Sequence, residues 1–276
     1  HVLSPLDPEM AGPVEAELRS HGVDIRTSVT IERIENGGVF LTDGTEVRPG
    51  FLIDASGVVP NVGLARSAGL RLGPTGGIAV DPRNRTSDPH IHAVGDGVEK
   101  IDAISGEPVL VTMAGLANRH GRSVADVIIG RDERSTPALG TAIVKVFDLV
   151  AAKTGWSERQ LVAAERPHRV IHTHPASHAT YYPGAQSMSM KLLVDPETDA
   201  ILGAQIVGGE GVDKRIDVIA VAMAGGITAS GLTRLELAYA PQFGAAKDPI
   251  NQLGYVADNI RAGATATIQW HELDDA

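Results

Sequence analysis

Hydrophobic and polar positions predict one helix and several short strands in residues 1–60. Met10, Val14 and Leu18 share one helical face. Asp7-Pro8 is a helix start, in which Asp caps and Pro takes the first helical position, and a glycine at position 22 ends the helix. Asn-Gly and Asp-Gly turns follow, and they predict a β-meander. The expected extended runs are 23–26, 30–35, 39–41 and 51–55.

The second stretch, 61–136, predicts short strands and one long helix. Turn signals separate strands at 78–80 and 91–94, and the latter ends at Gly95-Asp96-Gly97. Helical spacing then runs over 113–130. The residues available for its buried stripe are Met113, Leu116, Ala117, Val124, Val127 and Ile128.

The third stretch, 137–264, predicts an α+β domain with its own core. Ser157 and Gln160 have capping-box spacing before Leu161. Hydrophobic residues at 212, 216, 219 and 223 have helical spacing. The expected strands are 143–147, 187–194 and 200–207.

Composition narrows the classes of function. The chain has 276 residues, 43% of them hydrophobic, and a formal net charge of −10. Such a charge argues against nucleic-acid and anionic-membrane partners, and no apolar run reaches the roughly 18 residues of a membrane helix. No signal peptide is recognised, so a cytoplasmic location is expected. The chain opens at His1 without an initiator methionine, and we expect it to be cut from a longer protein.

Cysteine is absent. The chain therefore has no disulfide framework, no thiolate nucleophile and no cysteine-based metal site of its own. Four histidines lie between positions 168 and 178, and His172 with His174 would share a strand face. No third ligand stands at a telling spacing, so no metal site is predicted.

One motif ends in a carboxylate suited to polyol hydroxyls. Thr86-Ser87-Asp88-Pro89-His90-Ile91-His92-Ala93-Val94-Gly95-Asp96 places Gly-Asp after an expected strand. Glycine allows a ligand to approach the backbone, and a carboxylate accepts two hydrogen bonds. This string resembles the second flavin-binding signature of pyridine nucleotide–disulfide oxidoreductases. The resemblance implies that Gly95 and Asp96 bind FAD, with Asp96 on the ribityl chain.

Two further strings are similar to the same family. Asp54-Ala55-Ser56-Gly57-Val58-Val59-Pro60-Asn61 resembles the crossover from the NAD(P) domain to the FAD domain, which adds Gly57 to the cofactor residues. The string from Val111 to Arg122 resembles the helix that points at the flavin ring. Its free N–H groups and dipole would favour negative charge on the reduced flavin. The implied contacts are Thr112, Met113 and Ala114.

The third stretch indicates a branch of this family. Leu237-Ala238-Tyr239-Ala240-Pro241-Gln242-Phe243, with Ala246-Lys247-Asp248-Pro249-Ile250-Asn251, resembles coenzyme A-disulfide reductases (CoADR). Strings 177–185 and 211–217 agree. The resemblance implies that Tyr239 and either Tyr181 or Tyr182 act at the partner's active-site sulfur across a homodimer. It leaves the choice between Tyr181 and Tyr182 open.

The coenzyme A phosphates would need cationic and polar contacts. Asn118 and Arg122 are candidates, the arginine because its guanidinium can donate two hydrogen bonds to one phosphate group. Lys247 is a weaker candidate, as is Arg215.

The implied fold class is α/β plus α+β, a partial two-dinucleotide-binding-domain flavoprotein followed by an α+β dimerisation domain. Residues 1–60 would be the trailing part of the NAD(P)-binding domain, 61–136 the second FAD-binding segment and 137–264 the dimerisation domain. Residues 265–276 would lead toward a possible rhodanese domain. The expected parent enzyme passes electrons from NAD(P)H through FAD to a disulfide, persulfide or polysulfide of coenzyme A.

Two alternatives stay open. One is an NADH oxidase or peroxidase, and the other is a non-catalytic dimerisation module. This chain by itself is expected to be inactive, because it holds no redox cysteine and no Gly-x-Gly-x-x-Gly turn.

Overall fold

The computed structural model describes residues 1–269 and 272–273. The helices are α1 (Pro8–Ser20), α2 (Gly63–Ser67), α3 (Ala114–Ile128), α4 (Glu158–Ala163), α5 (Val212–Ala224), α6 (Pro249–Arg261) and the 3-10 helix η1 (Ser230–Arg234). The strands are β1 (Ile31–Glu35), β2 (Gly38–Leu41), β3 (Glu46–Val47), β4 (Lys100–Ile101), β5 (Pro108–Val109), β6 (Ala142–Val146), β7 (Leu149–Gly155), β8 (Arg169–Thr173), β9 (Met188–Val194) and β10 (Ile201–Gly208). Among the described helices, none is both long enough and apolar enough to cross a membrane.

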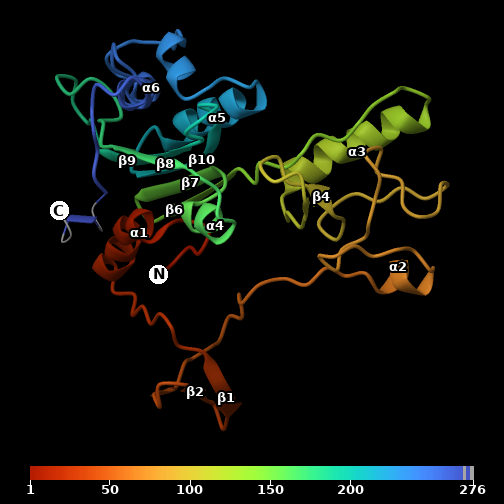
Figure 1. The fold of residues 1–276 in the computed structure, drawn as a ribbon. Coiled ribbons are helices and arrows are strands. Elements are labelled where there is room, and N and C mark those ends of the chain that lie inside the picture. The colour runs from red at the N-terminus through yellow and green to blue at the C-terminus, as the bar shows by residue number, and fades with distance from the viewer. Residues whose placement is uncertain (270–271, 274–276) are drawn as a thin grey trace.

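A five-stranded antiparallel sheet forms the core of the C-terminal region, in the order β6-β7-β10-β9-β8. Helices α5 and α6 cover one face of the sheet, and α1 and α4 cover the other (Figure 1). The central strand β10 is therefore buried along its whole length. Its side chains alternate between two cores: Ile206 packs with Ile216 and Leu253 on one face, and Val207 packs with Met10 and Val14 on the other.

Local sequence signals in this region are confirmed. The capping box exists, because the Ser157 hydroxyl accepts from the Gln160 amide at 3.3 Å while the Gln160 side chain accepts from the Ser157 amide at 3.0 Å. Strands β6, β9 and β10 and helix α5 lie where the hydrophobic pattern predicts them. Helix α3 is also confirmed, although its predicted stripe is partly wrong: Leu116 is buried, but Ile128 is 67% exposed.

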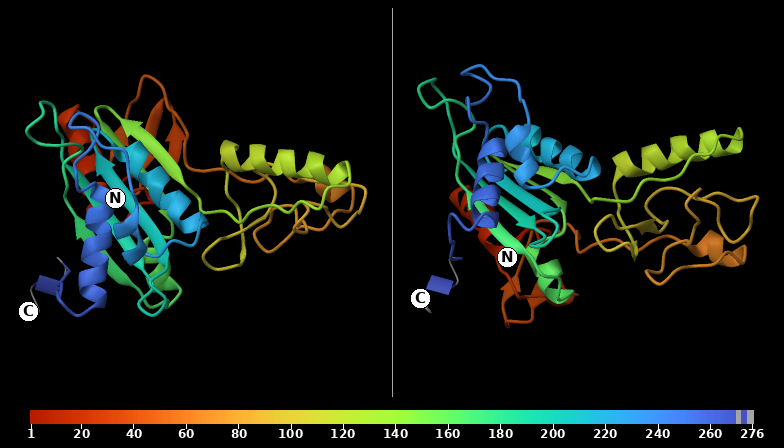
Figure 2. Two further views of the ribbon diagram at one scale, coloured as in Figure 1. Left: turned by 90° about the horizontal axis from the view of Figure 1, so that it is seen from above. Right: turned by 45° about the horizontal axis from the view of Figure 1, so that its top comes forward.

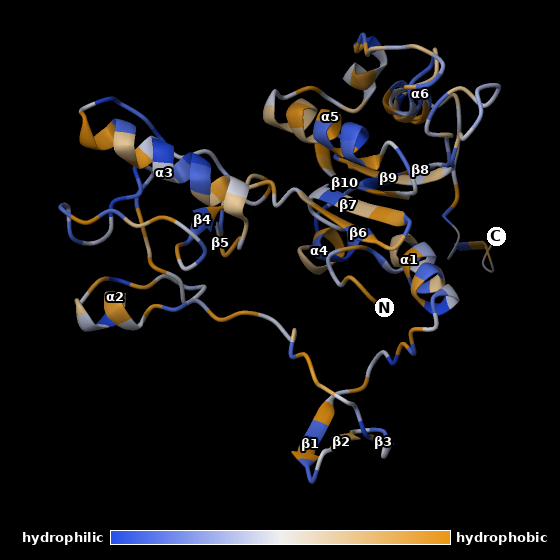
Figure 3. Cartoon of the chain, turned by 180° about the vertical axis from the view of Figure 1, so that it is seen from behind, coloured by the Kyte–Doolittle hydropathy of each residue, from blue (hydrophilic) through white to orange (hydrophobic). Residues whose placement is uncertain are grey.

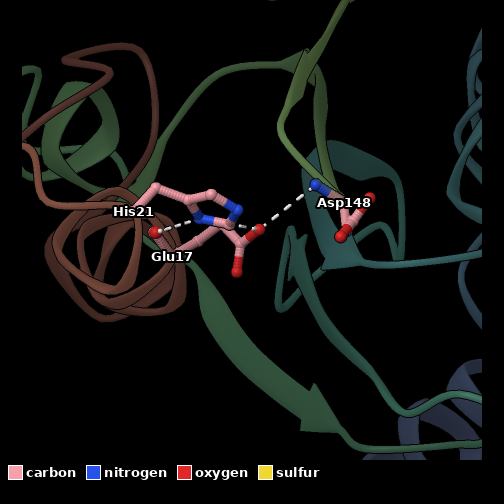
Figure 4. Close-up of side chains that lie close together, drawn as sticks. All are labelled: Glu17, His21 and Asp148. Carbon is pink, nitrogen blue, oxygen red and sulfur yellow. Dashed lines mark hydrogen bonds and ion pairs between the residues drawn. The ribbon is translucent and has the colours of Figure 1, made fainter.

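Helix α1 packs on the C-terminal sheet, although it lies in the first stretch of the sequence. Figure 4 shows Glu17, near the end of α1, and His21, just after it, facing Asp148, which lies in the turn between β6 and β7. The amide of Asp148 donates to Glu17 Oε1 at 3.1 Å, and the His21 ring stacks on Phe147 with ring centroids 3.8 Å apart. The end of α1 is thus held by a hairpin that begins more than a hundred residues later.

Asp7 does not cap α1 with its side chain. It takes the N-cap position, but its carboxylate accepts from the Glu158 and Arg159 amides at 3.0 and 3.2 Å, at the start of α4. The prediction that Asp7 caps its own helix is therefore wrong in its hydrogen bond. The Asp7 carboxylate instead forms an ion pair with Lys191, whose Nζ lies 2.9 Å from Asp7 Oδ2.

Much of the chain between α1 and β6 extends away from the C-terminal sheet (Figure 2), although Asp102 and Ile104 contact it through Trp156 and Arg166. Figure 2 shows the hairpin of β1 and β2 and the region around α3 projecting from it. Strands β1 and β2 confirm two of the predicted runs, with Ile34 opposite Val39. The strands predicted at 23–26 and 51–55 do not form, and those at 78–80 and 91–94 make only isolated bridges, at Ile78 and His92.

The physical reason for these missing strands is a lack of pairing partners within the described chain. A strand needs a neighbour for its backbone N–H and C=O groups. Phe51 is 79% exposed and Ile53 is 75% exposed. In Figure 3 much of the connection between β3 and α2 is orange, the colour of hydrophobic residues.

The predicted linker at 265–276 lies partly outside the described residues. Of its described part, Gln269 donates its side-chain amide to the Val170 carbonyl at 3.1 Å, beside β8.

Candidate functional site

The Gly95-Asp96 turn leaves its backbone and carboxylate open to approach. Gly95 has a φ of +99°, and a Cβ placed there would meet no heavy atom within 4 Å. Asp96 is exposed. Lys100 stabilises the turn, because its ammonium donates to the Gly95 carbonyl at 2.5 Å and to the Val98 carbonyl at 2.9 Å. Burial lowers the pKa of Lys100, and the Asp96 charge opposes that effect.

His120 of α3 is buried and its Nε2 lies 3.2 Å from the Thr136 carbonyl. Burial lowers the pKa of His120, and the positive charge of Lys100 lowers it further, although the contact with Thr136 opposes both.

The start of α3 is available to a negatively charged group. Met113 is the N-cap in an extended conformation, and no side chain caps the first turn. The N–H groups of the first turn therefore have no side-chain partner, and the positive end of the helix dipole can attract an anion. A cleft of about 630 Å³ opens beside this helix end, between α3 and α5. Its lining includes Met113, Leu116, Arg119, Asp217 and Val221.

Gly57 lies in an exposed connection with a φ of +131°, a conformation that disfavours other residues. The next part of this connection reaches the Asp96 turn, since a Cβ on Gly97 would lie 3.8 Å from the Asn61 carbonyl. Apart from its chain neighbours, no heavy atom lies within 4 Å of the position that a Cβ on Gly57 would take.

Tyr239 contacts one of the two tyrosines between which the sequence did not choose. The hydroxyls of Tyr181 and Tyr239 lie 3.0 Å apart in a hydrogen bond. Tyr182 instead packs edge-on against His178, with ring centroids 5.8 Å apart. The hydrogen bond with Tyr181 raises the pKa of Tyr239. Tyr239 therefore keeps its proton to higher pH than an isolated phenol.

The four candidate phosphate contacts do not converge within one chain. Asn118 and Arg122 lie on the exposed side of α3, where Arg122 pairs with Asp126 at 2.9 Å. Lys247 precedes α6, with its ammonium 5.2 Å from the Tyr255 ring centroid. Figures 1 and 2 show α3 and α6 at opposite sides of the chain. The weaker candidate Arg215 is only 1% exposed and forms an ion pair with Asp248.

Three of the four histidines of 168–178 contact separate carboxylates. His168 faces Glu158 at 3.7 Å, His172 faces Glu9 at 3.8 Å and His178 faces Glu210 at 4.0 Å. They do not form one cluster in the described structure.

Sequence reasoning missed a buried charge cluster around Lys191. Lys191 is fully buried and pairs with Asp7 at 2.9 Å, with Glu158 at 2.5 Å and with Glu9. Burial by itself would lower the pKa of Lys191, but its three carboxylate partners raise it. The available signal was a lysine inside the apolar strand β9, because such a charge must be paired when the strand is buried.

His172 lies beside this cluster and makes stability depend on pH. Burial lowers the pKa of His172, and the charge of Lys191 lowers it further. In the unfolded chain a histidine has a pKa of about 6.5. As pH falls below that value the unfolded state binds the proton first, so the free energy of unfolding decreases.

We expect His172→Gln to reduce this acid sensitivity. Urea unfolding at about pH 7 and about pH 5 should show a smaller loss of stability in the variant than in the unaltered chain. His90→Gln, at an exposed position, is the control. An unchanged pH dependence in His172→Gln would exclude His172 as the group responsible.

Two family models match most of the chain. The model described as pyridine nucleotide-disulphide oxidoreductase matches residues 1–117, and the model of the dimerisation domain of these proteins matches residues 141–248. Fold and matches together define a chain with a dinucleotide-binding region followed by a dimerisation domain, which confirms the predicted fold class.

Individual relatives support the same family. The NAD(P)H sulfur oxidoreductase (CoA-dependent) of Pyrococcus furiosus is 34% identical over 91% of this chain and 57% of its own length. The NADH oxidase of Methanocaldococcus jannaschii is 33% identical over 89% of this chain and 55% of its own. The structure of reduced CoADR-RHD from Bacillus anthracis matches with a TM-score of 0.97 and 42% identity, covering 98% of this chain and 49% of that one.

The chain belongs to the pyridine nucleotide-disulphide oxidoreductase family. It spans about half the length of the relatives that it matches. The resemblance inferred from the sequence is thereby confirmed.

Proposed function

We propose that this chain supplies the C-terminal part of a homodimeric, FAD-dependent enzyme that uses NAD(P)H to reduce a disulfide, persulfide or polysulfide of coenzyme A. For a disulfide, the hydride equivalent from NAD(P)H (two electrons and one proton) and one further proton break the sulfur–sulfur bond, leaving two thiols and NAD(P)⁺. The observation that carries the proposal is the hydroxyl pair of Tyr181 and Tyr239, 3.0 Å apart. It lies in a chain similar to a CoA-dependent sulfur oxidoreductase.

The residues at the predicted flavin site fit such a cofactor. Gly95 allows close approach to the backbone, and the exposed Asp96 carboxylate can accept hydrogen bonds from a polyol. Thr112, Met113 and Ala114 lie at an uncapped helix start that suits negative charge. Gly57 belongs to the same proposed set. FAD, when bound, supplies the two-electron relay between nicotinamide and sulfur.

The tyrosine pair is suited to hold and transfer a proton at sulfur. Tyr239 remains protonated at neutral pH, and the hydrogen bond to Tyr181 raises its pKa further. Its hydroxyl can therefore donate to a thiolate leaving group when a disulfide is cleaved, and Tyr181 orients that hydroxyl. The chain has no cysteine, so the reacting protein sulfur must come from outside this sequence.

The charged and polar groups on α3 are the proposed contacts of coenzyme A phosphate. Arg122 forms an exposed pair with Asp126, and phosphate would compete for its guanidinium. Asn118 is one helical turn away. Lys247 lies far from both in one chain, so its contribution would come from the partner subunit of the dimer. The location proposed for the complete enzyme is the cytoplasm.

Replacing Asp96 tests the flavin site. The chain would be joined to the part of the Pyrococcus furiosus relative that it does not match, and FAD binding would be measured by flavin fluorescence. Asp96→Ala should lose about 1.5–3 kcal/mol of binding free energy, which is a roughly 10- to 100-fold higher Kd.

Glu107→Ala removes another exposed carboxylate and serves as the matched control. A colourless chimera, or equal FAD affinity in Asp96→Ala and the control, would contradict the assignment of Asp96.

An oxidase is the second candidate, because one similar protein is named an NADH oxidase. In that reaction a cysteine sulfenic acid would form, and oxygen or peroxide would be reduced. Stopped-flow oxidation of the reduced chimera by coenzyme A disulfide, peroxide and oxygen distinguishes the two. Faster oxidation by oxygen or peroxide than by the disulfide would favour the oxidase.

A third candidate is a dimerisation module without catalysis, since the C-terminal sheet has cores on both faces. Sedimentation and flavin absorbance of the purified chain test it. A dimer that carries reducible flavin would exclude a purely structural role.

A further inference from the structure

The two paired tyrosines lie on separate loops. Tyr181 belongs to the loop between β8 and β9, and Tyr239 belongs to the loop between η1 and α6. Tyr181 is 75% exposed and Tyr239 is 48% exposed, so close packing does not fix either ring. The separation of the two hydroxyls therefore depends on how the loops are held together.

One buried guanidinium contacts both loops. Arg215, in the first turn of α5, donates Nη2 to the Ser177 carbonyl at 2.9 Å, in the loop of Tyr181. The same nitrogen donates to Asp248 Oδ2 at 2.9 Å, at the end of the loop of Tyr239. Asp248 is fixed in turn, because its carboxylate accepts from the Ile250 amide at 3.0 Å and caps α6. An interior ion pair of this kind has little freedom to rearrange.

A lysine beside it holds the backbone next to the second tyrosine. Lys214 Nζ donates to the Ala238 carbonyl at 3.3 Å, immediately before Tyr239, and lies 3.8 Å from Asp248 Oδ2. The loops also contact each other directly, since the Ala179 amide donates to the Gly244 carbonyl at 2.9 Å. Both tyrosine loops are thus tied to one turn of α5.

We propose that Arg215 and Lys214 are positioning residues that set the distance between the hydroxyls of Tyr181 and Tyr239. The catalytic meaning of this arrangement rests on the proposed function, but the arrangement itself does not. Arg215 acts on both loops through one guanidinium, and Lys214 acts on the backbone of the second loop. Neither side chain needs to touch substrate.

The glycine before α5 leaves the space that the Arg215 guanidinium needs for this positioning role. Gly211 has a φ of +76°, and a Cβ there would lie 2.2 Å from Arg215 Nη1. Arg215 Nη1 donates to the Gly211 carbonyl at 3.2 Å. A side chain at this position would therefore have to displace the guanidinium from its contacts, in addition to straining the backbone.

The titration of Tyr239 provides a readout that a general loss of stability would not move. The chain has four tyrosines, so NMR of ring-labelled tyrosine can follow each one. Tyr181→Phe removes the hydroxyl partner and should lower the pKa of Tyr239 toward its ordinary value, because the partner's hydrogen bond raises it. This variant defines the result for a broken pair.

Lys214→Met and Arg215→Lys should move the Tyr239 titration toward that of Tyr181→Phe. A lysine at 215 keeps the charge but cannot hold Ser177 and Asp248 with one planar group. Arg166→Met is the matched control, since it also removes a cation that donates to a backbone carbonyl, that of Ile104 at 2.8 Å. It should leave the Tyr239 titration unchanged.

The proposal is overturned if folded Lys214→Met and any folded Arg215→Lys titrate like the unaltered chain. It is equally overturned if Tyr181→Phe does not change the Tyr239 titration, because the pair would then not form in solution. Should Arg215→Lys fail to fold, Lys214→Met, at a partly exposed side chain, decides the matter.

Turnover measured in the chimera separates this inference from the proposed function. If the variants shift the Tyr239 titration but leave reduction of coenzyme A disulfide unchanged, the positioning role stands and the catalytic role of the tyrosines fails.

Discussion

Lys191→Met is expected to destabilise the chain by about 3–5 kcal/mol, because it leaves Asp7, Glu9 and Glu158 together without their cation. The ammonium is fully buried, and Asp7 is only 2% exposed. Removing one member of a buried ion pair leaves an uncompensated charge in a region of low dielectric. The loss should appear as a lower free energy of unfolding in urea.

Lys145→Met is the control for this substitution. Lys145 lies on the edge strand β6 and is exposed, so its replacement should change stability by no more than about 0.5 kcal/mol. Adding Asp7→Asn to Lys191→Met should recover part of the lost stability, since it removes one of the repelling charges. Equal stability of Lys191→Met and the control would show that the buried cluster is not needed.

Acid should weaken the same cluster. Burial by itself would raise the pKa of Asp7, but the hydrogen bond and charge of Lys191 and the amides of Glu158 and Arg159 outweigh it and lower that pKa. A lowered carboxyl pKa contributes stability that is present above the unfolded value of about 4 and is lost as pH falls through the folded value. This loss lies at lower pH than the effect of His172.

Tyr239→Phe is expected to slow reduction of coenzyme A disulfide by about 10²- to 10⁴-fold in the chimera, the usual contribution of a positioned proton donor. The phenyl ring fills the same space, but it has no proton to give to the departing thiolate. The loss should appear in kcat, because the proton is needed as the sulfur–sulfur bond breaks rather than when substrate binds.

Two further tyrosine variants make this test specific. Tyr181→Phe should give a smaller loss in kcat, because it leaves the Tyr239 hydroxyl in place without its partner. Tyr255→Phe keeps the ring that faces Lys247 and should leave turnover unchanged. Full activity in Tyr239→Phe would remove the tyrosine pair from the proposed reaction.

The sequence by itself determined the features that arise from neighbouring residues. The capping box of Ser157 and Gln160, the buried stripe of α5 and the antiparallel strands β9 and β10 depend on local spacing and on burial of one face. The motif strings also indicated the family that the comparisons confirm. These patterns can be recognised from the sequence because the residues that form each of them lie close together along the chain.

Only the tertiary structure decided which distant residues meet. Asp7 bonds the start of α4 and Lys191 instead of its own helix, and Tyr239 pairs with Tyr181 rather than Tyr182. The strand predicted at 51–55 does not form and is exposed, because strand formation depends on a neighbouring strand that the local pattern does not reveal. Contacts between residues far apart in sequence depend on how the elements pack, and hydrophobic spacing in one element does not specify that packing.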